Sequence, residues 1–246
     1  GKLESRGGSF YLTTTTVGAT AKVQAIHDFV QRKADGSITH TTIIKAGTVV
    51  YKFNASTGVF DQVQTGLSES KPSIVNFISN AGSTPEDREV IIYADGTNLG
   101  MYNGTTWTDI ASNFTAGGGT DIPRYLFAKH NFLWATGDDS NPDKVFFSPL
   151  LAPDTNWGSN DWVRIAGGLE KVIGLNEVYD HLFVAGQNSM HIITGKTSSD
   201  FSPIQVSGEV GCSSHWSIVP VESDIFWANE TGIHVGRLRA AEDRAS

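Results

Sequence analysis

The chain repeats one pattern of apolar and polar positions five times. Each repeat has a short apolar run that ends in alanine, then a tight polar turn, then a second apolar run. In one repeat the run Leu182–Ala185 precedes a turn at Gly186–Asn188, and Met190–Ile193 resumes the extended pattern. Short apolar runs separated by Gly, Asn or Asp are typical of paired β-strands. Each repeat is therefore predicted to form a β-hairpin.

The spacing of the repeats indicates the fold. The alanines that end the first runs stand at positions 46, 94, 135, 185 and 228, so successive repeats are 48, 41, 50 and 43 residues apart. A repeat of about 40–50 residues built from short strands is typical of a β-propeller blade. We therefore predict an all-β fold, a β-propeller with about five visible four-stranded blade repeats and five or six blades in the whole ring.

Further strand-like runs flank each hairpin and complete the blades. Inner strands are expected to be continuous apolar runs, because neighbouring blades cover both faces of a blade. The predicted blades span residues 23–66, 71–112, 123–166 and 171–207, and a fifth begins with Trp216–Val219 and ends at Val235. The fifth blade lacks a clear outer strand, and the third contains a long loop at residues 148–161.

The two ends of the chain are assigned separately from the propeller, which spans residues 23–236. Residues 1–22 are predicted to form an N-terminal arm in which the β-branched run Ser9–Thr16 pairs with the last blade and closes the ring. The alternative is a frayed or partner-bound terminus. Residues 237–246 form a charged tail, which either begins a short helix or continues into a longer chain.

Composition narrows the classes of function. The chain has 246 residues, of which 39% are hydrophobic, and this is enough for one all-β domain with a sizeable core. The formal charge of −8 disfavours neutralisation of phosphates, which argues against sequence-specific binding of duplex DNA. The single cysteine, Cys212, excludes an intrachain disulfide framework. No apolar run approaches the ~18–20 residues of a membrane span, so we predict no membrane-spanning segment.

One acidic turn raises the question of a metal. Asp138, Asp139 and Asp143 lie within a single turn, and hard oxygen ligands at alternate positions suit calcium. The turn lacks the bidentate glutamate spacing of an EF-hand, and Asx and Pro residues alone account for such a turn. The sequence leaves calcium binding by these three aspartates open, and no metal site is assigned.

The candidate catalytic residues do not form a recognisable motif in the sequence. The histidines at positions 27, 40, 130, 181, 191, 215 and 234 form no tight ligand pair, although His181 and His191 flank a hairpin, and zinc needs three or four ligands. Cys212 and His215 suggest a nucleophile and a base, but a buried structural cysteine accounts for the same residues. We assign no catalytic, cofactor-binding or metal-binding residue and expect neither an enzyme nor a cofactor.

A carbohydrate-binding or glycoside-hydrolysing propeller is the alternative. Such chemistry needs two carboxylates beside the scissile bond. The run Asn103–Trp107 is faintly similar to the Asp-box turns of sialidases, but it does not meet the full pattern. This alternative therefore rests on fold analogy. It expects carboxylates paired in one pocket, whereas a non-catalytic structural protein has them dispersed.

Several strings along the chain carry a family resemblance. They are Asp143–Ser148, Trp162–Ile165, Val172–Leu175 with Leu182–Val184, Gly211–Val219 and Ile225–Ile233. These strings resemble the propeller of short-tailed bacteriophage tail proteins, the class called tail nozzle, tail tubular protein B or DNA-stabilisation protein. The similarity covers most of residues 40–236 and concerns the sequence pattern of the strands and turns in each blade, not catalytic residues. The missing outer strand and the short tail depart from a full-length member.

The resemblance implies a structural protein located in the virion tail. The implied partners are further copies of the chain in a ring of six, other tail proteins such as the adaptor and tail fibres, and DNA that passes without sequence-specific binding. The protein would extend the DNA ejection channel and help to retain or release the genome. An acidic lumen repels DNA phosphates, although ordinary solubility also accounts for the charge of −8.

A six-membered ring needs a heterologous interface between neighbouring copies. The long loop at residues 148–161 and the N-terminal arm are the sequence candidates for this interface. On this interpretation, deletion of Leu151–Trp157 is expected to leave a folded monomer that fails to assemble.

Overall fold

The strands form five antiparallel sheets, and within each sheet the strands pair in the order of the sequence. The computed structural model describes residues 17, 22–115 and 121–237. Sheet one contains β1 (Val23–Arg32), β2 (Ile38–Ala46), β3 (Val49–Asn54) and β4 (Val59–Gln64). Sheet two contains β5 (Ser73–Ile78), β6 (Glu89–Ala94), β7 (Leu99–Tyr102) and β8 (Trp107–Asp109).

The remaining sheets follow the same plan. Sheet three contains β9 (Tyr125–Lys129), β10 (Phe132–Thr136), β11 (Lys144–Phe147) and β12 (Trp162–Arg164). Sheet four contains β13 (Val172–Val178), β14 (His181–Gly186), β15 (Met190–Thr194) and β16 (Ser202–Ser207). Sheet five contains β17 (Val219–Val221), β18 (Asp224–Asn229) and β19 (Gly232–Arg237).

In the part of the chain that the structure describes, helical structure is confined to single turns. They are the α-helical turn α1 (Pro85–Arg88) and the 3-10 turns η1 (Ala111–Asn113), η3 (Ala166–Gly168) and η4 (His215–Ser217). Among the residues that the structure describes, no helix is long and apolar enough to cross a membrane.

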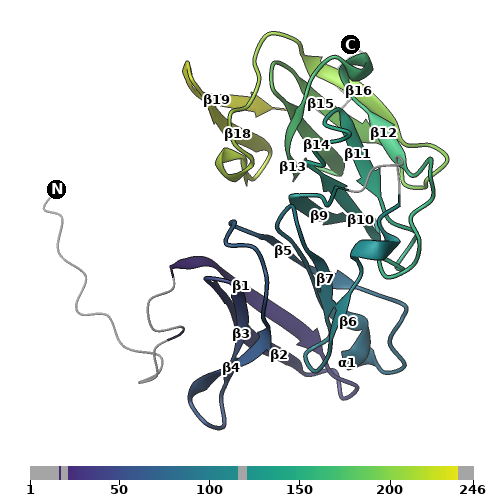
Figure 1. The fold of residues 1–246 in the computed structure, drawn as a ribbon. Coiled ribbons are helices and arrows are strands. Elements are labelled where there is room, and N and C mark those ends of the chain that lie inside the picture. Colours follow the sequence, from purple (N-terminus) through teal and green to yellow (C-terminus); the bar gives the residue numbers. More distant parts are fainter. Residues whose placement is uncertain (1–16, 18–21, 116–120, 238–246) are drawn as a thin grey trace, which may run out of the picture.

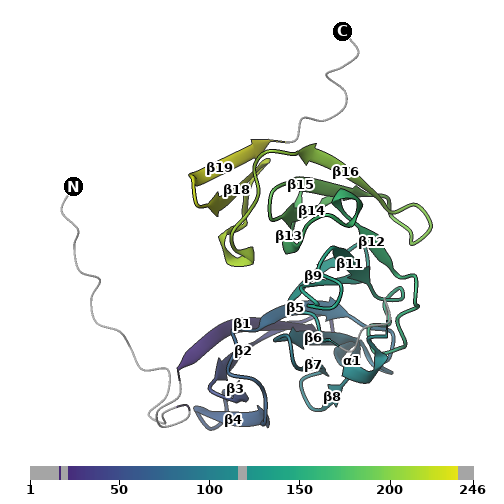
Figure 2. The ribbon, with the colours of Figure 1, turned by 45° about the horizontal axis from the view of Figure 1, so that its top comes forward.

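The sheets follow one another around an arc (Figures 1 and 2). The first strands β1, β5, β9, β13 and β17 contact each other in turn and form the inner side of this arc. Sheets one and five lie at its two ends, and no strand pairing joins them in the described part of the chain. The prediction of an all-β fold made of successive antiparallel sheets is confirmed. The predicted closing strand, Ser9–Thr16, lies outside the described residues.

The core is divided among the spaces between successive sheets. One apolar cluster fills each space, and the largest aromatic side chains lie there, such as Trp134 between sheets three and four and Tyr93 between sheets one and two. The alanines that mark the repeat are the last or the penultimate residue of the second strand of each sheet. Ala94, Ala135 and Ala185 are completely buried.

The predicted blade boundaries agree with the sheets, except at the start of the fifth. The pattern predicted a strand at Trp216–Val219, whereas the structure has η4 followed by β17. The Ser214 hydroxyl accepts a hydrogen bond from the Trp216 backbone N–H, and the Ile218 N–H donates to the His215 carbonyl. These bonds favour a helical turn over an extended strand. The missing outer strand of the fifth blade is confirmed for the described residues.

The long loop at residues 148–161 packs into the core. Its Trp157 is 1% exposed and lies 5.1 Å from Phe114 between ring centroids. The Trp157 backbone N–H donates to the Asn113 carbonyl, and the Asn113 amide donates to the Asp154 carbonyl. Deletion of residues 151–157 would therefore remove a core tryptophan. The expectation that this deletion leaves a folded monomer is wrong, although a role of the loop in assembly remains a prediction.

Candidate functional site

One end of the arc collects the turns that follow the marker alanines and the links between sheets. We call this end the rim: it comprises residues 47–48, 65–72, 95–98, 110–115, 121–124, 137–143, 165–171, 187–189, 208–218 and 230–231. Backbone hydrogen bonds tie each link to the turn of the preceding sheet. They join Leu67 N to Thr48 O (3.0 Å), Gly96 N to Pro123 O (3.2 Å), Val172 N to Pro142 O (2.7 Å) and Cys212 N to Gly186 O (3.0 Å).

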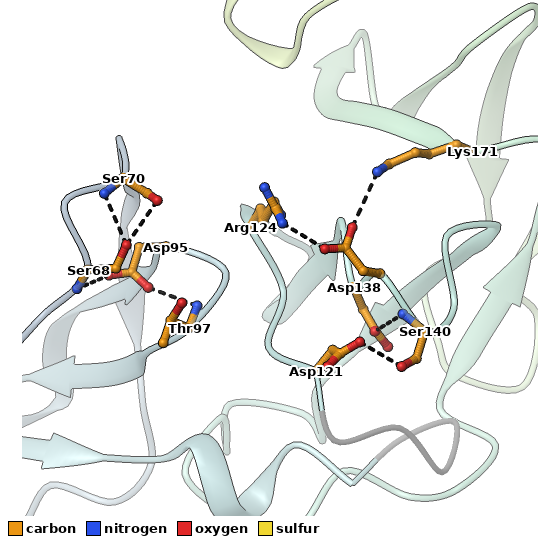
Figure 3. A network of polar contacts seen from close by, with 10 residues as sticks. Ser68, Ser70, Asp95, Thr97, Asp121, Arg124, Asp138, Ser140 and Lys171 are labelled. Carbon is orange, nitrogen blue, oxygen red and sulfur yellow. Dashed lines mark hydrogen bonds and ion pairs between the residues drawn. The ribbon is translucent and has the colours of Figure 1, made fainter.

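An ion network holds the rim around sheet three together (Figure 3). Asp139 accepts from Arg124 at 2.7 Å and lies 3.4 Å from the Lys171 ammonium, so it connects the links that lead into sheets three and four. Burial alone would raise the pKa of Asp139, but the hydrogen bonds and positive charges of Arg124 and Lys171 outweigh it and lower the pKa.

The other two candidate calcium ligands are engaged elsewhere. Asp138 is completely buried and accepts from the Ser140 backbone N–H and the Asn141 amide, both at 2.8 Å. Asp143 forms an ion pair with Arg164. Within the described residues, no group of three His, Cys, Asp or Glu side chains lies close enough to hold a metal. The three aspartates thus form an Asx-stabilised turn, and the structure does not bring them together.

Asp95 organises the rim around sheet two in the same way (Figure 3). One carboxylate oxygen accepts from the backbone N–H groups of Thr97 and Asn98, and the other accepts from the Ser68 N–H and the Tyr93 hydroxyl. Burial and the Asp95 charge together raise the pKa of Tyr93 strongly, so this phenol keeps its proton and remains a donor. Asp95 and Asp139 are therefore structural groups that hold links onto turns.

An aromatic stack joins three distant parts of the chain beside this network. Tyr125 stacks on His215 with ring centroids 4.5 Å apart, and His215 meets Trp216 edge-on at 4.7 Å. The Lys71 ammonium lies 3.9 Å from the centroid of Trp216, a cation–π contact. Because these residues come from the links into sheets two and five and from β9, sequence spacing offered no signal that would have found them.

His215 is held neutral in this stack. Burial, and then the charge of Lys71, lowers its pKa from 6.5 to about 4. Its Nδ1 atom accepts a hydrogen bond from the Leu175 backbone N–H at 3.3 Å. The buried Cys212 thiol donates instead to the Ser214 carbonyl at 3.2 Å. The cysteine and histidine that suggested a nucleophile and a base therefore turn toward different partners.

The lowered pKa of His215 predicts a specific loss of stability in acid. Between pH 6.5 and about 4 the unfolded chain binds a proton that the folded chain excludes, so stability falls as the pH falls through this window. The slope due to this residue reaches at most about 1.4 kcal/mol per pH unit. In His215→Asn, whose amide oxygen can still accept from Leu175, urea titrations from pH 4 to 7.5 should show a shallower loss. Equal slopes in the two proteins would contradict the assignment.

A polar cavity of about 620 Å³ opens in the rim between sheets four and five. Lys171 and the turn at residues 187–188 line one side, and the link and turn of sheet five line the other. Glu209 and Glu230 are among the lining residues, and Tyr125 connects the cavity to the aromatic stack. Because the cavity is concave, polar and joined to the aromatic stack through Tyr125, it is a candidate small-ligand site.

The remaining sequence candidates are dispersed. His40 contacts Asp28 at 2.7 Å, His130 contacts Asp180 at 2.9 Å, and His234 contacts Asn229 at 2.8 Å. His181 pairs across the sheet with Val178 and His191 with Val184, so the hairpin does not place these two histidines opposite each other.

The faint Asp-box similarity corresponds to a structural turn. The Asn103 side chain accepts from the backbone N–H groups of Thr105 and Thr106. Trp107 packs edge-on against Tyr93, with ring centroids 5.6 Å apart. Both contacts stabilise the hairpin between β7 and β8, and they account for the residue types at this turn.

Comparison with known proteins informs the fold and not the chemistry. No family model and no curated protein matches the chain. Among solved structures, BBS1N in complex with ARL6DN is 12% identical, with a TM-score of 0.51 over 93% of this chain and 66% of that one. The extracellular domain of a hybrid two-component system from B. thetaiotaomicron is 10% identical, with a TM-score of 0.46 over 88% of this chain and 33% of that one.

At these identities a likeness concerns the fold alone. The match includes nearly the whole of this chain but slightly less than two thirds of the length of BBS1N. Together with the five radially ordered antiparallel sheets, this likeness supports one conclusion. The chain has a β-propeller-like, all-β fold.

Proposed function

We propose that this chain is a non-catalytic structural component of a bacteriophage tail, the β-propeller part of a nozzle or hub with five or six blades. In this role it forms part of the DNA ejection channel in the virion, as a ring of copies that contacts the adaptor and the tail fibres. The observation that carries the proposal is an arc with an apolar sheet face exposed at each end, which suits a subunit of a larger assembly.

These two end faces are built from named strands. In sheet five, Trp227 packs toward Phe183 of sheet four, so the alternate positions face away from the arc. There Val219, Val221, Ile233 and Val235 are 49%, 50%, 81% and 58% exposed. In sheet one, Phe29 packs toward sheet two, and Ile26 and Ile38 on the opposite face are 70% and 55% exposed.

The distribution of charge supports a channel through which DNA slides. Among described residues, the rim holds nine carboxylates and three Lys or Arg side chains. The turns at the opposite end of the sheets hold eight carboxylates and three such cations. Both ends are therefore acidic, and either end would repel phosphates if it faced the lumen of the ring.

Electron microscopy of the purified protein, with native mass measured on the same sample, tests the proposal. A six-fold ring with an open lumen is the expected result, and the position of the acidic loops in it follows directly. Particles that stay monomeric at every concentration and also with tail partners present would overturn it. Binding to duplex DNA is expected to be weak and independent of sequence.

A surface variant tests the loop at residues 148–161 as the ring interface without disturbing the core. Leu150 is 54% exposed on this loop. We expect Leu150→Asp to abolish ring formation because a charge would be buried at the interface, while the melting temperature stays unchanged. Leu169→Asp is the matched control, since Leu169 is 90% exposed at the other end of the sheets. Rings of Leu150→Asp at normal yield would remove this loop from the interface.

A glycan-binding propeller is the second candidate, because the cavity of about 620 Å³ has Glu209 and Glu230 in its lining. A glycan array and hydrolysis assays on the same protein distinguish the two functions. Saturable binding that is lost in Glu209→Gln and Glu230→Gln, together with a monomeric state, would favour this candidate.

A further inference from the structure

The outer strands of sheets one to four share a short sequence pattern. At each of these strands an aromatic residue is followed, three positions later, by isoleucine or valine. We call this the aromatic–aliphatic pattern. An odd spacing places two residues on opposite faces of an extended strand, so each pair can reach the spaces on both sides of its sheet. The pairs are Phe60 and Val63, Trp107 and Ile110, Trp162 and Ile165, and Phe201 and Ile204.

The two members of each pair pack in a fixed direction. The aromatic ring lies in the space before its own sheet, and the aliphatic side chain lies in the space after it. Trp107 packs between sheets one and two, whereas Ile110 packs between sheets two and three. Trp162 packs between sheets two and three, whereas Ile165 packs between sheets three and four. Each space therefore receives the aliphatic residue of one sheet and the aromatic residue of the next.

The space between sheets four and five has only half of this arrangement in the described chain. Sheet four supplies Ile204, which pairs with Ile192 of the cluster that faces sheet five. Sheet five ends with β19, so it has no described outer strand to supply the aromatic residue. Ile204 is 48% exposed, whereas its counterparts Ile110 and Ile165 are completely buried. The missing ring leaves this part of the core uncovered.

A mainly apolar cavity of about 340 Å³ lies between β16 and β19, where the missing ring would be. Phe183 and Met190 line it from sheet four, and Ile225 and Trp227 line it from sheet five. Trp227 is 7% exposed, and its indole N–H has no hydrogen-bond partner among the described residues. Buried donors in folded proteins are almost always paired. The cavity therefore lacks both a ring and an oxygen acceptor.

The backbone of β19 offers an edge to an added strand. Its pairing partner in sheet five is β18, and its other edge presents N–H and C=O groups that form a template for an extended segment. The outer strands β12 and β16 of sheets three and four contact each other. A strand added to β19 would contact β16 in the same way and would cover the cavity.

We propose that β19 binds an extended segment of another polypeptide that carries the aromatic–aliphatic pattern. The aromatic ring enters the cavity beside Trp227, and an oxygen atom of the bound segment accepts from the indole N–H. The aliphatic residue lies on the opposite face of the sheet, beside Ile233 and Val235, which are 81% and 58% exposed. This inference does not rest on the proposed tail function.

The distribution of the pattern favours a segment from another polypeptide. The pattern occurs five times in the chain, and the fifth occurrence, Trp216–Val219, leads into β17. All five occurrences thus belong to described parts of the fold, and a second copy could supply one only by giving up a strand of its own. Residues 1–16 and 238–246 do not contain the pattern. In Ser9–Thr16 a threonine stands three positions after each aromatic residue.

A peptide tests the proposal on the full chain. The probe has the sequence of residues 104–112, which contains Trp107 and Ile110, and the control peptide has serine in place of both. Two-dimensional NMR follows the indole N–H signals, and Trp227→Phe identifies the signal of Trp227. We expect only the probe to shift this signal saturably and to slow amide exchange of β19 by at least about tenfold. The absence of saturable binding at millimolar peptide would overturn the proposal.

Variants of the cavity wall locate the binding site. Val206 is 42% exposed and lines the cavity. Val206→Asp should weaken binding of the probe by at least about tenfold, because the bound ring would remove water from the carboxylate. Ile78→Asp is the matched control, since Ile78 is 47% exposed on β5 of sheet two, and it should bind the probe as the native chain does.

Two further outcomes would contradict the proposal. Equal affinities of the Val206→Asp and Ile78→Asp variants would show that the probe binds elsewhere. Slow exchange of the Trp227 indole N–H and of β19 in the protein without peptide would show that a segment of the chain itself or a second copy already occupies the edge. Native mass measured on the same sample distinguishes these two occupants, and either of them would overturn the proposal.

Discussion

Replacing Trp134 with alanine is expected to lower the free energy of unfolding by about 3–5 kcal/mol. Trp134 is 2% exposed and is the largest side chain in the cluster between sheets three and four. Its ring packs against Phe201 at 4.6 Å and Phe147 at 5.6 Å between centroids. Alanine would leave a cavity among these aromatic rings and would also remove the indole donor to the Lys129 carbonyl.

Chemical denaturation followed by circular dichroism measures this loss. The matched control is Trp216→Ala, because Trp216 is 42% exposed and its ring contacts Lys71 at the surface of the stack. We expect Trp216→Ala to lower the free energy of unfolding much less, by about 1 kcal/mol. Two variants of equal stability would show that the packing between sheets three and four is not a main source of stability.

Replacing Gly211 with alanine is expected to destabilise the protein by about 3 kcal/mol, at the upper end of overpacking effects. A Cβ atom at this position would overlap the backbone oxygen of Gln187, so the link into sheet five would have to move off the turn of sheet four. The move would break the hydrogen bonds from Cys212 N to Gly186 O and from the Asn229 amide to Gly211 O. The first bond holds the link to sheet four, and the second holds the same link to sheet five.

Gly208→Ala is the control for this prediction. Gly208 lies in the same link, but a Cβ there would meet the far end of the Gln205 side chain, which can move away. We expect a change in melting temperature of a few degrees at most for Gly208→Ala and a much larger decrease for Gly211→Ala. A Gly211→Ala protein that melts like the native chain would show that the link does not pack tightly on the turn.

The repeat could be predicted from the sequence because every sheet has the same local sequence features. An apolar run, a small residue at the crowded end and a turn of Gly, Asn or Asp recur at nearly constant spacing, and each is a local property of the sequence. The structure confirms the spans of four blades and the absence of a described outer strand in the fifth. Its start was predicted wrongly at Trp216–Val219, because the capping hydrogen bond that the Trp216 N–H donates to the Ser214 hydroxyl outweighs the apolar character of that run.

The candidate site was much less predictable. Lys71, Tyr125 and Trp216 meet only because the links into sheets two and five converge on the start of β9, and no local pattern encodes that meeting. The long loop was predicted to be dispensable for folding and a candidate for the ring interface, yet Trp157 anchors it in the core. Conversely, the acidic turn suggested a metal, whereas Arg124 and Lys171, which come from other links, neutralise Asp139. Contacts between residues far apart in the sequence were the missing information in each case.

The arrangement of the sheets in an arc has a consequence for how the protein unfolds. Each sheet packs against its sequence neighbours, so the molecule is close to a one-dimensional chain of units whose stability is a sum of unit and nearest-neighbour terms. The three middle sheets have two such neighbours, whereas sheets one and five have one each in the described chain. Unfolding therefore starts from the two terminal units and proceeds inward. A contact between sheets one and five would remove both free ends, so that the five sheets would unfold together as one cooperative unit.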